Sequence, residues 1–189
     1  MPSNSTVVMP EDVLRFEQPT LGYLCPLQAN VVGVEFIRFQ IKDYESGAMV
    51  YQSGQAPTEE TEMPSSQEEI EHMMRSVKYK FPTEFLDYET VRTLLEFKVG
   101  PQPVKDFEMI ELHFFKNKLV RMFRFQFGFV IPSSVNTWEA IYDMPKYSPA
   151  MKEDYISNPF AHTSDSFYFV DGRLIMHNKA AYAYVPTAN

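Results

Sequence analysis

Cysteine is nearly absent from the sequence, since Cys25 is the single cysteine among 189 residues. One cysteine excludes an intrachain disulfide and any zinc site built on paired cysteines, and it suits a reducing compartment. Common enzyme motifs are missing as well: there is no H-E-x-x-H zinc motif, no G-x-S-x-G nucleophile turn, no phosphate-binding loop and no dinucleotide fingerprint. We therefore expect a protein that is not an enzyme and needs no cofactor.

Basic clusters and long apolar runs are absent too. The chain has 17 lysines and arginines against 25 acidic residues, a net charge of −8, which makes nucleic acid and anionic membrane surfaces poor partners. We find no signal peptide and no apolar stretch near the roughly 18 residues of a membrane helix, which predicts a soluble, cytoplasmic protein without stable membrane insertion. Pro2 stands where a myristoylated chain needs glycine, so this chain is not expected to carry that lipid itself.

Aromatic residues, by contrast, make up 15% of the chain, and proline outnumbers glycine by 14 to 7. Alternating aromatic segments broken by turns favour strands over helices, and the length suits one domain with a full core. The sequence therefore predicts an all-β fold, an antiparallel β-sandwich of roughly eight or nine strands with one short helix. We expect residues 1–30 to be a largely flexible tail, 31–185 to form the sandwich, and 186–189 to be a second tail.

Turn and cap residues locate two elements near the C-terminus. Asp171-Gly172 predicts a two-residue hairpin turn between strands at 166–170 and 173–177. Ser148 as N-cap and Pro149 at the first helical position predict the one helix, which ends before the next proline.

Two stretches show no clear periodicity. Residues 133–138 carry many short polar side chains and are interpreted as an irregular crossing between strands. Residues 53–71 hold six glutamates and no positive charge. This acidic segment is interpreted as a solvated loop, and a docking site for a basic partner is the alternative.

The most regular alternation lies in residues 107–132. One face of its second half is apolar and carries Phe123, Phe125, Phe127, Phe129 and Ile131. Large aromatics in a row on one strand face need another apolar layer against them. In its first half Glu111 and His113 share a face, and Asn117-Lys118 is expected to form the turn between the halves.

The register of this hairpin decides what Glu111 and His113 face. A two-residue turn places Glu111 opposite Arg124, as an ordinary solvated surface pair. A three-residue turn places Glu111 opposite Phe125 and His113 opposite Phe123, and polar groups among phenylalanines need a partner. Both registers stay open on the residues alone.

The function of the phenylalanine face is open at this point as well. The rings either fill an ordinary core, as in a pure interaction module, or line a slot between the sheets that holds an apolar ligand. Glu111-x-His113 could supply two metal ligands from one strand, but no third ligand is evident.

Several longer motifs favour the slot. Residues 127–142 (FGFVIPSSVNTWEAIY) resemble the signature of the phosphodiesterase-delta superfamily of lipid-binding carriers. Residues 164–182 (SDSFYFVDGRLIMHNKAAY), with 109–115 (MIELHFF), resemble more narrowly its uncoordinated-119 branch of myristoyl-binding carriers. The resemblance extends from about Asp12 to Tyr184. It implies an immunoglobulin-like β-sandwich with a hydrophobic lipid pocket between its sheets.

The resemblance also implies a function and a site. Family members bind myristoylated N-termini of client proteins, keep them soluble and release them to a GTP-loaded Arf-like GTPase, often for delivery to cilia. Carried over residue by residue, it makes the pocket lining Phe39, Tyr79, Phe85, Phe123, Tyr142 and Tyr168, with Glu111, His113 and Ser166 as polar groups for the acyl-glycine amide of the client. This requires the register in which Glu111 and His113 point among phenylalanines. It implies no catalytic residue and no metal.

The sequence departs from the family pattern in places. Leu112 replaces an expected basic residue and Met144 an expected aromatic, while residues 53–74 show no close match, so client or GTPase contacts there are not carried over. The family implies a cytoplasmic protein, with enrichment at the base of the cilium or flagellum. The alternatives are a prenyl-protein carrier or a free fatty-acid binding protein with the same sandwich, although Glu111 would repel a fatty-acid carboxylate.

Overall fold

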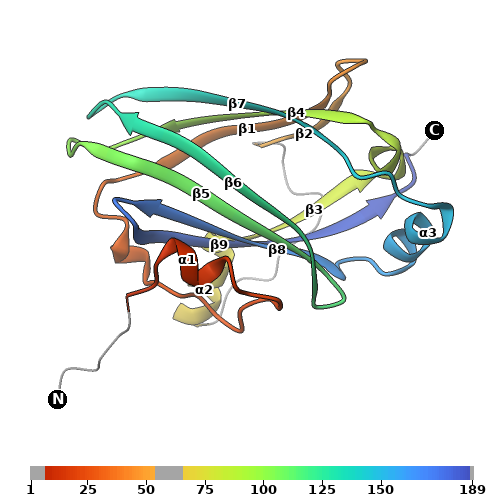
Figure 1. The fold of residues 1–189 in the computed structure, drawn as a ribbon, viewed down its shortest axis with the longest axis horizontal. Helices are drawn as coiled ribbons and strands as arrows, with labels where there is room; N and C mark the ends of the chain where they lie inside the picture. The colour runs from red at the N-terminus through yellow and green to blue at the C-terminus, as the bar shows by residue number, and fades with distance from the viewer. Residues whose placement is uncertain (1–6, 54–65, 188–189) are drawn as a thin grey trace.

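Two β-sheets packed face to face form the frame of the protein, whose computed structural model describes residues 7–53 and 66–187 (Figure 1). The first sheet has the strand order β2-β1-β4-β7 and the second the order β3-β9-β8-β5-β6. In chain order the strands of the described residues are β1 Glu35–Asp43, β2 Met49–Gln52, β3 Ser76–Pro82, β4 Thr90–Lys98, β5 Val104–Phe115, β6 Lys118–Val130, β7 Val135–Asp143, β8 His162–Val170 and β9 Arg173–Val185. The predicted all-β sandwich is confirmed.

One strand pair departs from the antiparallel prediction. β3 runs parallel to β9, from Ser76 beside Lys179 to Pro82 beside Val185. The strand before it, β2, belongs to the other sheet, so the chain crosses between sheets here instead of turning back in a tight hairpin. A long crossover can deliver a strand in either direction, whereas a two-residue hairpin always gives an antiparallel neighbour.

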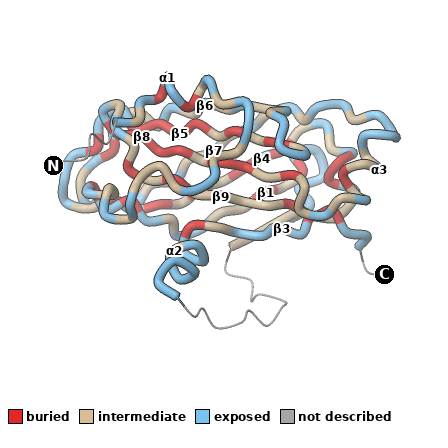
Figure 2. The backbone as a smooth tube through the Cα atoms, turned by 90° about the horizontal axis from the view of Figure 1, so that it is seen from below, coloured by how far each residue is buried: buried red, intermediate tan, exposed pale blue. Residues whose placement is uncertain are grey.

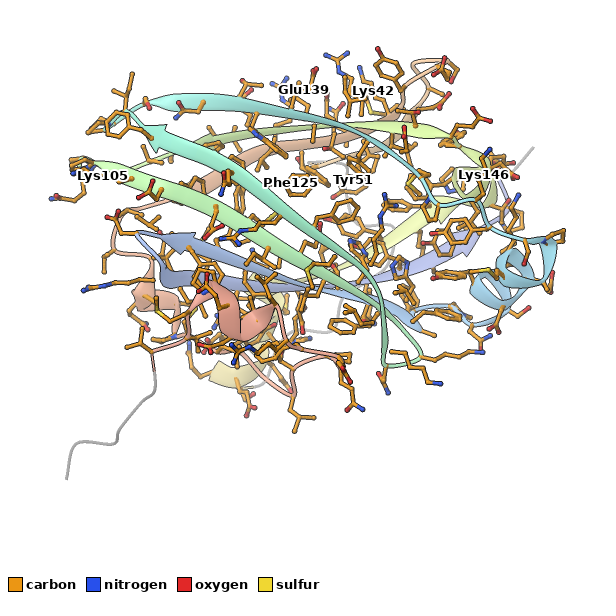
Figure 3. All side chains as sticks on the ribbon, in the orientation of Figure 1. Lys42, Tyr51, Lys105, Phe125, Glu139 and Lys146 are labelled. Carbon is orange, nitrogen blue, oxygen red and sulfur yellow. The ribbon has the colours of Figure 1, made fainter. Side chains whose placement is uncertain are left out.

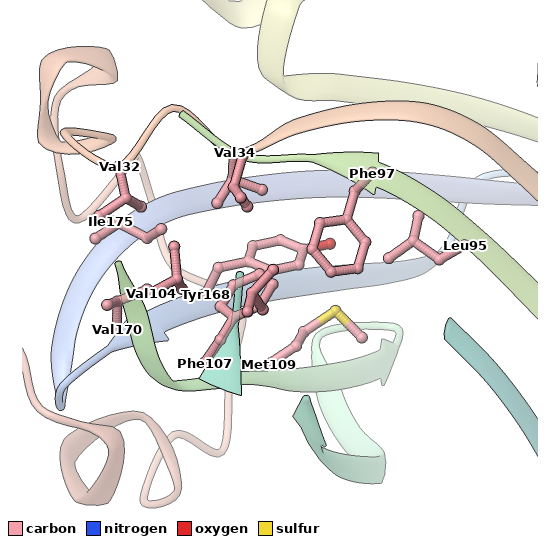
Figure 4. Close-up of a cluster of buried hydrophobic side chains, with 12 residues drawn as sticks. Val32, Val34, Leu95, Phe97, Val104, Phe107, Met109, Tyr168, Val170 and Ile175 are labelled. Carbon is pink, nitrogen blue, oxygen red and sulfur yellow. The ribbon is translucent and has the colours of Figure 1, made fainter. Parts of the chain in front are cut away.

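The side chains between the two sheets are arranged differently at the two ends of the sandwich. At one end, Phe97, Phe107 and Tyr168 pack tightly with aliphatic neighbours (Figure 4). At the other end, near α3 (Pro149–Ser157), a second group of mainly aromatic residues lines the interior. Buried residues run along the central strands in Figure 2. Figure 3 shows Phe125 and Tyr51 directed between the sheets, because side chains alternate along each strand.

The outer face of the second sheet is also apolar, and residues 8–24 cover it. Val13, in the short helix α1 (Pro10–Val13), is fully buried against outward-pointing side chains of β5 and β8. The backbone N–H of Thr20 donates to the carboxylate of Asp165 on β8 at 2.9 Å. This corrects the expectation of a largely flexible tail over residues 1–30, because the exposed apolar face of the sheet needs a cover. Residues 1–6 and 188–189 lie outside the described residues.

One helix was predicted from the sequence, and a second helix lies where a loop was expected. α3 begins with Ser148 as N-cap, whose hydroxyl accepts from the N–H of Met151, as predicted. A second helix, α2 (Gln67–Arg75), occupies part of the segment interpreted as an acidic loop. Ser66 and Glu69 form a reciprocal capping box at its start, which is a helix signal. The remainder of that loop, residues 54–65, lies outside the described residues. Two short 3-10 helices, η1 (Leu27–Ala29) and η2 (Thr83–Asp87), complete the described helices.

The β5–β6 hairpin turns one residue earlier than expected. Lys116-Asn117 both have positive φ, 50° and 63°, and form the tight turn that pairs Phe115 with Lys118. Continued without interruption, this pairing would place Glu111 opposite Met122 on the outward face of the sheet.

A β-bulge in β6 changes the pairing, so that Glu111 lies opposite a different residue. His113 pairs with Arg121 while the next residue of β5 pairs with Leu119, which leaves Val120 as an extra residue in β6. The extra residue shifts the register by one, so Glu111 faces Phe123. Neither register considered from the sequence is therefore correct. The polar pair nevertheless points inward among phenylalanines.

The end of β6 and the strand after it differ from expectation as well. Gly128 has φ +76° beside a second register shift, and beyond it Phe129 and Ile131 are exposed instead of sharing the apolar face. The stretch interpreted as an irregular crossing begins β7, which pairs with β4 along its length. Its inward positions start with the polar Asn136, and this obscured the alternation in the sequence.

Candidate functional site

A cavity of about 780 Å³ lies between the two sheets. This volume falls within the roughly 300–1,000 Å³ typical of ligand pockets. Aromatic rings line its walls and pack against one another along them. Tyr79, for example, meets Tyr51 edge-on at 4.8 Å and stacks on Tyr182 at 5.3 Å between ring centroids. A mainly apolar lining with a few polar groups suits a ligand with a long apolar part.

The structure brings all nine residues singled out from the sequence to the wall of this cavity. They come from both sheets and from η2: Phe39, Tyr79, Phe85, Glu111, His113, Phe123, Tyr142, Ser166 and Tyr168. Strand alternation explains the grouping, because Glu111 and His113 on β5 and Ser166 and Tyr168 on β8 are each two residues apart. Their role as contacts to a ligand stays a prediction.

Glu111 and His113 form the polar centre of the cavity wall. The side chains are 21% and 15% exposed, respectively, and Oε2 of Glu111 lies 3.5 Å from Nε2 of His113. The hydroxyl of Ser166 donates to Oε1 of Glu111 at 3.1 Å. Both carboxylate oxygens therefore have a protein partner and still keep lone pairs for a ligand donor.

The environment of Glu111 keeps its carboxylate ionised. Burial raises the pKa of Glu111, but the electrostatic attraction to His113 and hydrogen bonds from His113, Ser166 and Ser164 outweigh it and hold the pKa below its ordinary value. An ionised carboxylate in an apolar cavity accepts strong hydrogen bonds from N–H groups. It also repels a second carboxylate placed beside it.

Several tyrosine side chains line the same cavity as this carboxylate. Burial, and next to it the charge of Glu111, raises the pKa of Tyr142 and of Tyr168 well above the ordinary value. Burial, followed by Tyr51 and Glu111, does the same for Tyr79. The three side chains therefore remain O–H donors at neutral pH, facing the same cavity as Glu111.

Sequence reasoning missed several cavity residues. His162, on β8, and Tyr182 and Tyr184, on β9, line the cavity together with Arg121 of β6. The strand predicted at residues 166–170 began too late to include His162, which is the first residue of β8. Extending the alternation of β8 backward from Tyr168 places His162 on the same face, which is the signal that could have found it.

Metal binding and cysteine reactivity depend on the groups that surround each candidate side chain. In residues 7–53 and 66–187, no group of three or more His, Cys, Asp or Glu side chains is arranged to hold a metal ion. Cys25 lies beside Arg75, with 3.8 Å from Sγ to the guanidinium, and burial raises the pKa of its thiol. A thiol with a raised pKa is a poor nucleophile at neutral pH.

None of the helices in residues 7–53 and 66–187 has the length and apolar character needed to span a bilayer.

Fold and site together define a β-sandwich binding protein whose ligand cavity lies between its sheets. Residues 28–184 match the family described as "GMP-PDE, delta subunit", and the chain belongs to this family. Membership of the family supports a binding protein of the lipid-carrier kind.

Similar proteins place the chain in the unc-119 group of that family. It is 42% identical to the Protein unc-119 homolog of Drosophila melanogaster over 200 residues, covering 97% of this chain and 75% of the relative. It is 43% identical to Protein unc-119 of Caenorhabditis elegans (94% and 80% covered) and 43% identical to Protein unc-119 homolog B of Homo sapiens (94% and 72% covered). The resemblance found in the sequence motifs is confirmed.

Proposed function

We propose that this protein is a carrier that binds N-myristoylated client proteins by the acyl chain and the first residues. The observation that carries the proposal is the ionised Glu111, held by His113 and Ser166 in the wall of an aromatic cavity of about 780 Å³. The cavity offers an apolar environment for the acyl chain. Glu111 offers an acceptor for the amide N–H that joins this chain to the N-terminal glycine.

Energetics explain why a myristoyl carrier needs polar groups beside its cavity. A single myristoyl chain binds a bilayer with a constant near 10⁴ M⁻¹, roughly 5–6 kcal/mol. Burial of the same chain in a preformed apolar cavity gives a free energy of similar size. The acyl chain alone would therefore divide about equally between membrane and carrier, and contacts to the amide and first residues must favour the carrier.

The lipid class is the most direct test of this proposal. We expect a peptide with an N-terminal myristoyl-glycine to bind at least about tenfold, or roughly 1.4 kcal/mol, more tightly than a C-terminally farnesylated peptide. The reason is that the farnesyl thioether presents no amide N–H to Glu111 at the corresponding position. Competition titration against a fluorescent myristoylated peptide measures the ratio, and the unacylated peptide is the control. Equal or reversed preference would exclude the myristoyl assignment and favour a prenyl carrier.

We further propose that a GTP-loaded Arf-like GTPase releases the client, in the cytoplasm and at the base of the cilium or flagellum. Without hydrolysis, a held acyl chain can leave only when the cavity opens. A partner drives opening only if it binds the open form more tightly than the closed form. Among the strands of the described residues, β2 and β7 lie at the edges of one sheet and β3 and β6 at the edges of the other, and an edge can accept a partner strand.

A further inference from the structure

Inward side chains of β6, an edge strand of the second sheet, contact β7, an edge strand of the first (Figure 1). Phe125 and Phe127 both meet the ring of Trp138 on β7, with 4.9 and 4.8 Å between ring centroids. Nearer the start of β6, Phe123 meets Tyr142 of β7 at 5.0 Å. A row of aromatic contacts therefore joins the two sheets along this side of the sandwich as far as Tyr142.

Arg121 continues this row, because side chains two residues apart on a strand share a face. Its guanidinium donates to the backbone carbonyl of Asp143 at the end of β7 and lies 3.8 Å from Sδ of Met144. The guanidinium carbon also lies over two rings of the cavity wall, at 4.4 Å from the centroid of Phe123 and 5.6 Å from that of Tyr142. One cationic side chain of β6 thus contacts the end of β7 and the first residue beyond it.

The cavity reaches the surface of the protein beside this contact. Val120, Asp143 and Pro145 belong to the cavity wall and are exposed, Val120 to 49%. Arg121 lines the cavity as well and is half-buried. Separation of β6 from β7 at this point widens the opening, and it requires the guanidinium to leave the carbonyl of Asp143.

We propose that Arg121 is a latch, a side chain that joins β6 to β7 beside the cavity opening and thereby sets the rate at which an acyl chain enters and leaves. The inference rests on the proposed function for the identity of the ligand. The latch contact itself is a property of the ligand-free protein, and it acts without touching the acyl chain.

A latch of this kind has a kinetic effect that differs from the effect of a ligand contact. Entry and exit of the acyl chain both require the opening to widen, so the Arg121 contact must break in each direction. Once the chain lies inside, the contact re-forms, and its strength then contributes equally to the empty and to the loaded protein. It cancels in the affinity, because only a differential interaction shifts a binding equilibrium. Loss of the latch therefore raises both rate constants by the same factor.

Arg121→Met removes the latch, and Arg124→Met serves as its control. Methionine keeps an unbranched apolar stem over Phe123 and removes the charge and the hydrogen-bond donors of the guanidinium. Arg124 also belongs to β6, and its Nε donates to Oε2 of Glu108 on β5 at 2.7 Å. That bond joins two strands of the same sheet, so its loss does not release one sheet from the other. Circular dichroism verifies that both variants are folded.

Stopped-flow mixing with a fluorescent myristoylated peptide, in the absence of any GTPase, measures association and dissociation separately. We expect Arg121→Met to raise both rate constants about tenfold, the size of effect that one hydrogen bond to a charged group supports, with Kd within about twofold of the wild type. Both rate constants of Arg124→Met stay within about twofold of the wild type. A rise in dissociation alone would show that Arg121 holds the ligand directly. Unchanged rates, or an equal rise in Arg124→Met, would exclude the latch.

Hydrogen exchange of the ligand-free full chain provides a second measurement that needs no ligand. Exchange of strand amides follows local opening, so we expect the amides of residues 142–144 to exchange about tenfold faster in Arg121→Met than in the wild type or in Arg124→Met. Equal exchange in all three proteins overturns the latch even if myristoylated peptides bind. Faster exchange in Arg121→Met, together with no binding of acylated peptides by the wild type, overturns the proposed function instead.

Discussion

Phe123→Asp lowers the affinity for a myristoylated peptide by at least about 100-fold, or roughly 3 kcal/mol. Phe123 lines the cavity directly opposite Glu111, and its ring stacks on Phe125 at 5.4 Å and contacts Tyr142 at 5.0 Å. An aspartate there removes part of the apolar wall and places a second carboxylate beside the first. Fluorescence titration of the labelled peptide measures the loss, and circular dichroism verifies that the variant is folded.

Met122→Asp is the matched control for this substitution. Met122 is the adjacent residue of β6, lies on the opposite face and is 39% exposed. A new carboxylate on a solvated surface changes little, so we expect an affinity within about twofold of the wild type. If Phe123→Asp also binds within twofold while remaining folded, the aromatic face of β6 is ordinary core and the ligand lies elsewhere.

A GTP-analogue-loaded Arf-like GTPase from the same cell raises the dissociation rate of the bound myristoylated peptide by at least about tenfold. The physical reason is differential binding, because the partner can stabilise only the form of the sandwich in which the cavity has opened. Stopped-flow displacement with excess unlabelled peptide measures the rate.

The same GTPase loaded with GDP is the control, and it leaves the rate within about twofold of that without partner. A dissociation rate that ignores the nucleotide state would show a rigid cavity and a passive solubiliser. This result would remove the release step from the proposed function and leave the cavity itself untouched.

The features predicted correctly from the sequence depend on residues that are close together in the chain. Asp171-Gly172 forms the expected hairpin turn with φ of 49° and 71°, and Ser148 caps α3, because these conformations depend on residues within a few positions. The sequence of β4 alternates with a period of two without a break, which predicts one inward face, and Val91 and Phe97 on that face are buried.

The parts that could not be predicted depend on contacts distant in sequence. Val120 looks like any other strand residue, yet as the extra residue of a bulge it decides that Glu111 faces the cavity. Val13 shows its role only once an outward apolar face of the second sheet exists to be covered. His162 becomes part of the site because β8 brings it beside β5, and no spacing rule links it to His113.

The binding of an acyl chain to the full protein tests the proposed function most directly. Native mass spectrometry of the purified chain, mixed with equal amounts of a myristoylated peptide and the same peptide without its acyl group, measures both complexes in one spectrum. We predict a one-to-one complex with the myristoylated peptide and none with the unmodified peptide at the same concentration. If both peptides bind equally, or if neither peptide binds, the result contradicts a carrier that holds its clients by an acyl chain between the two sheets.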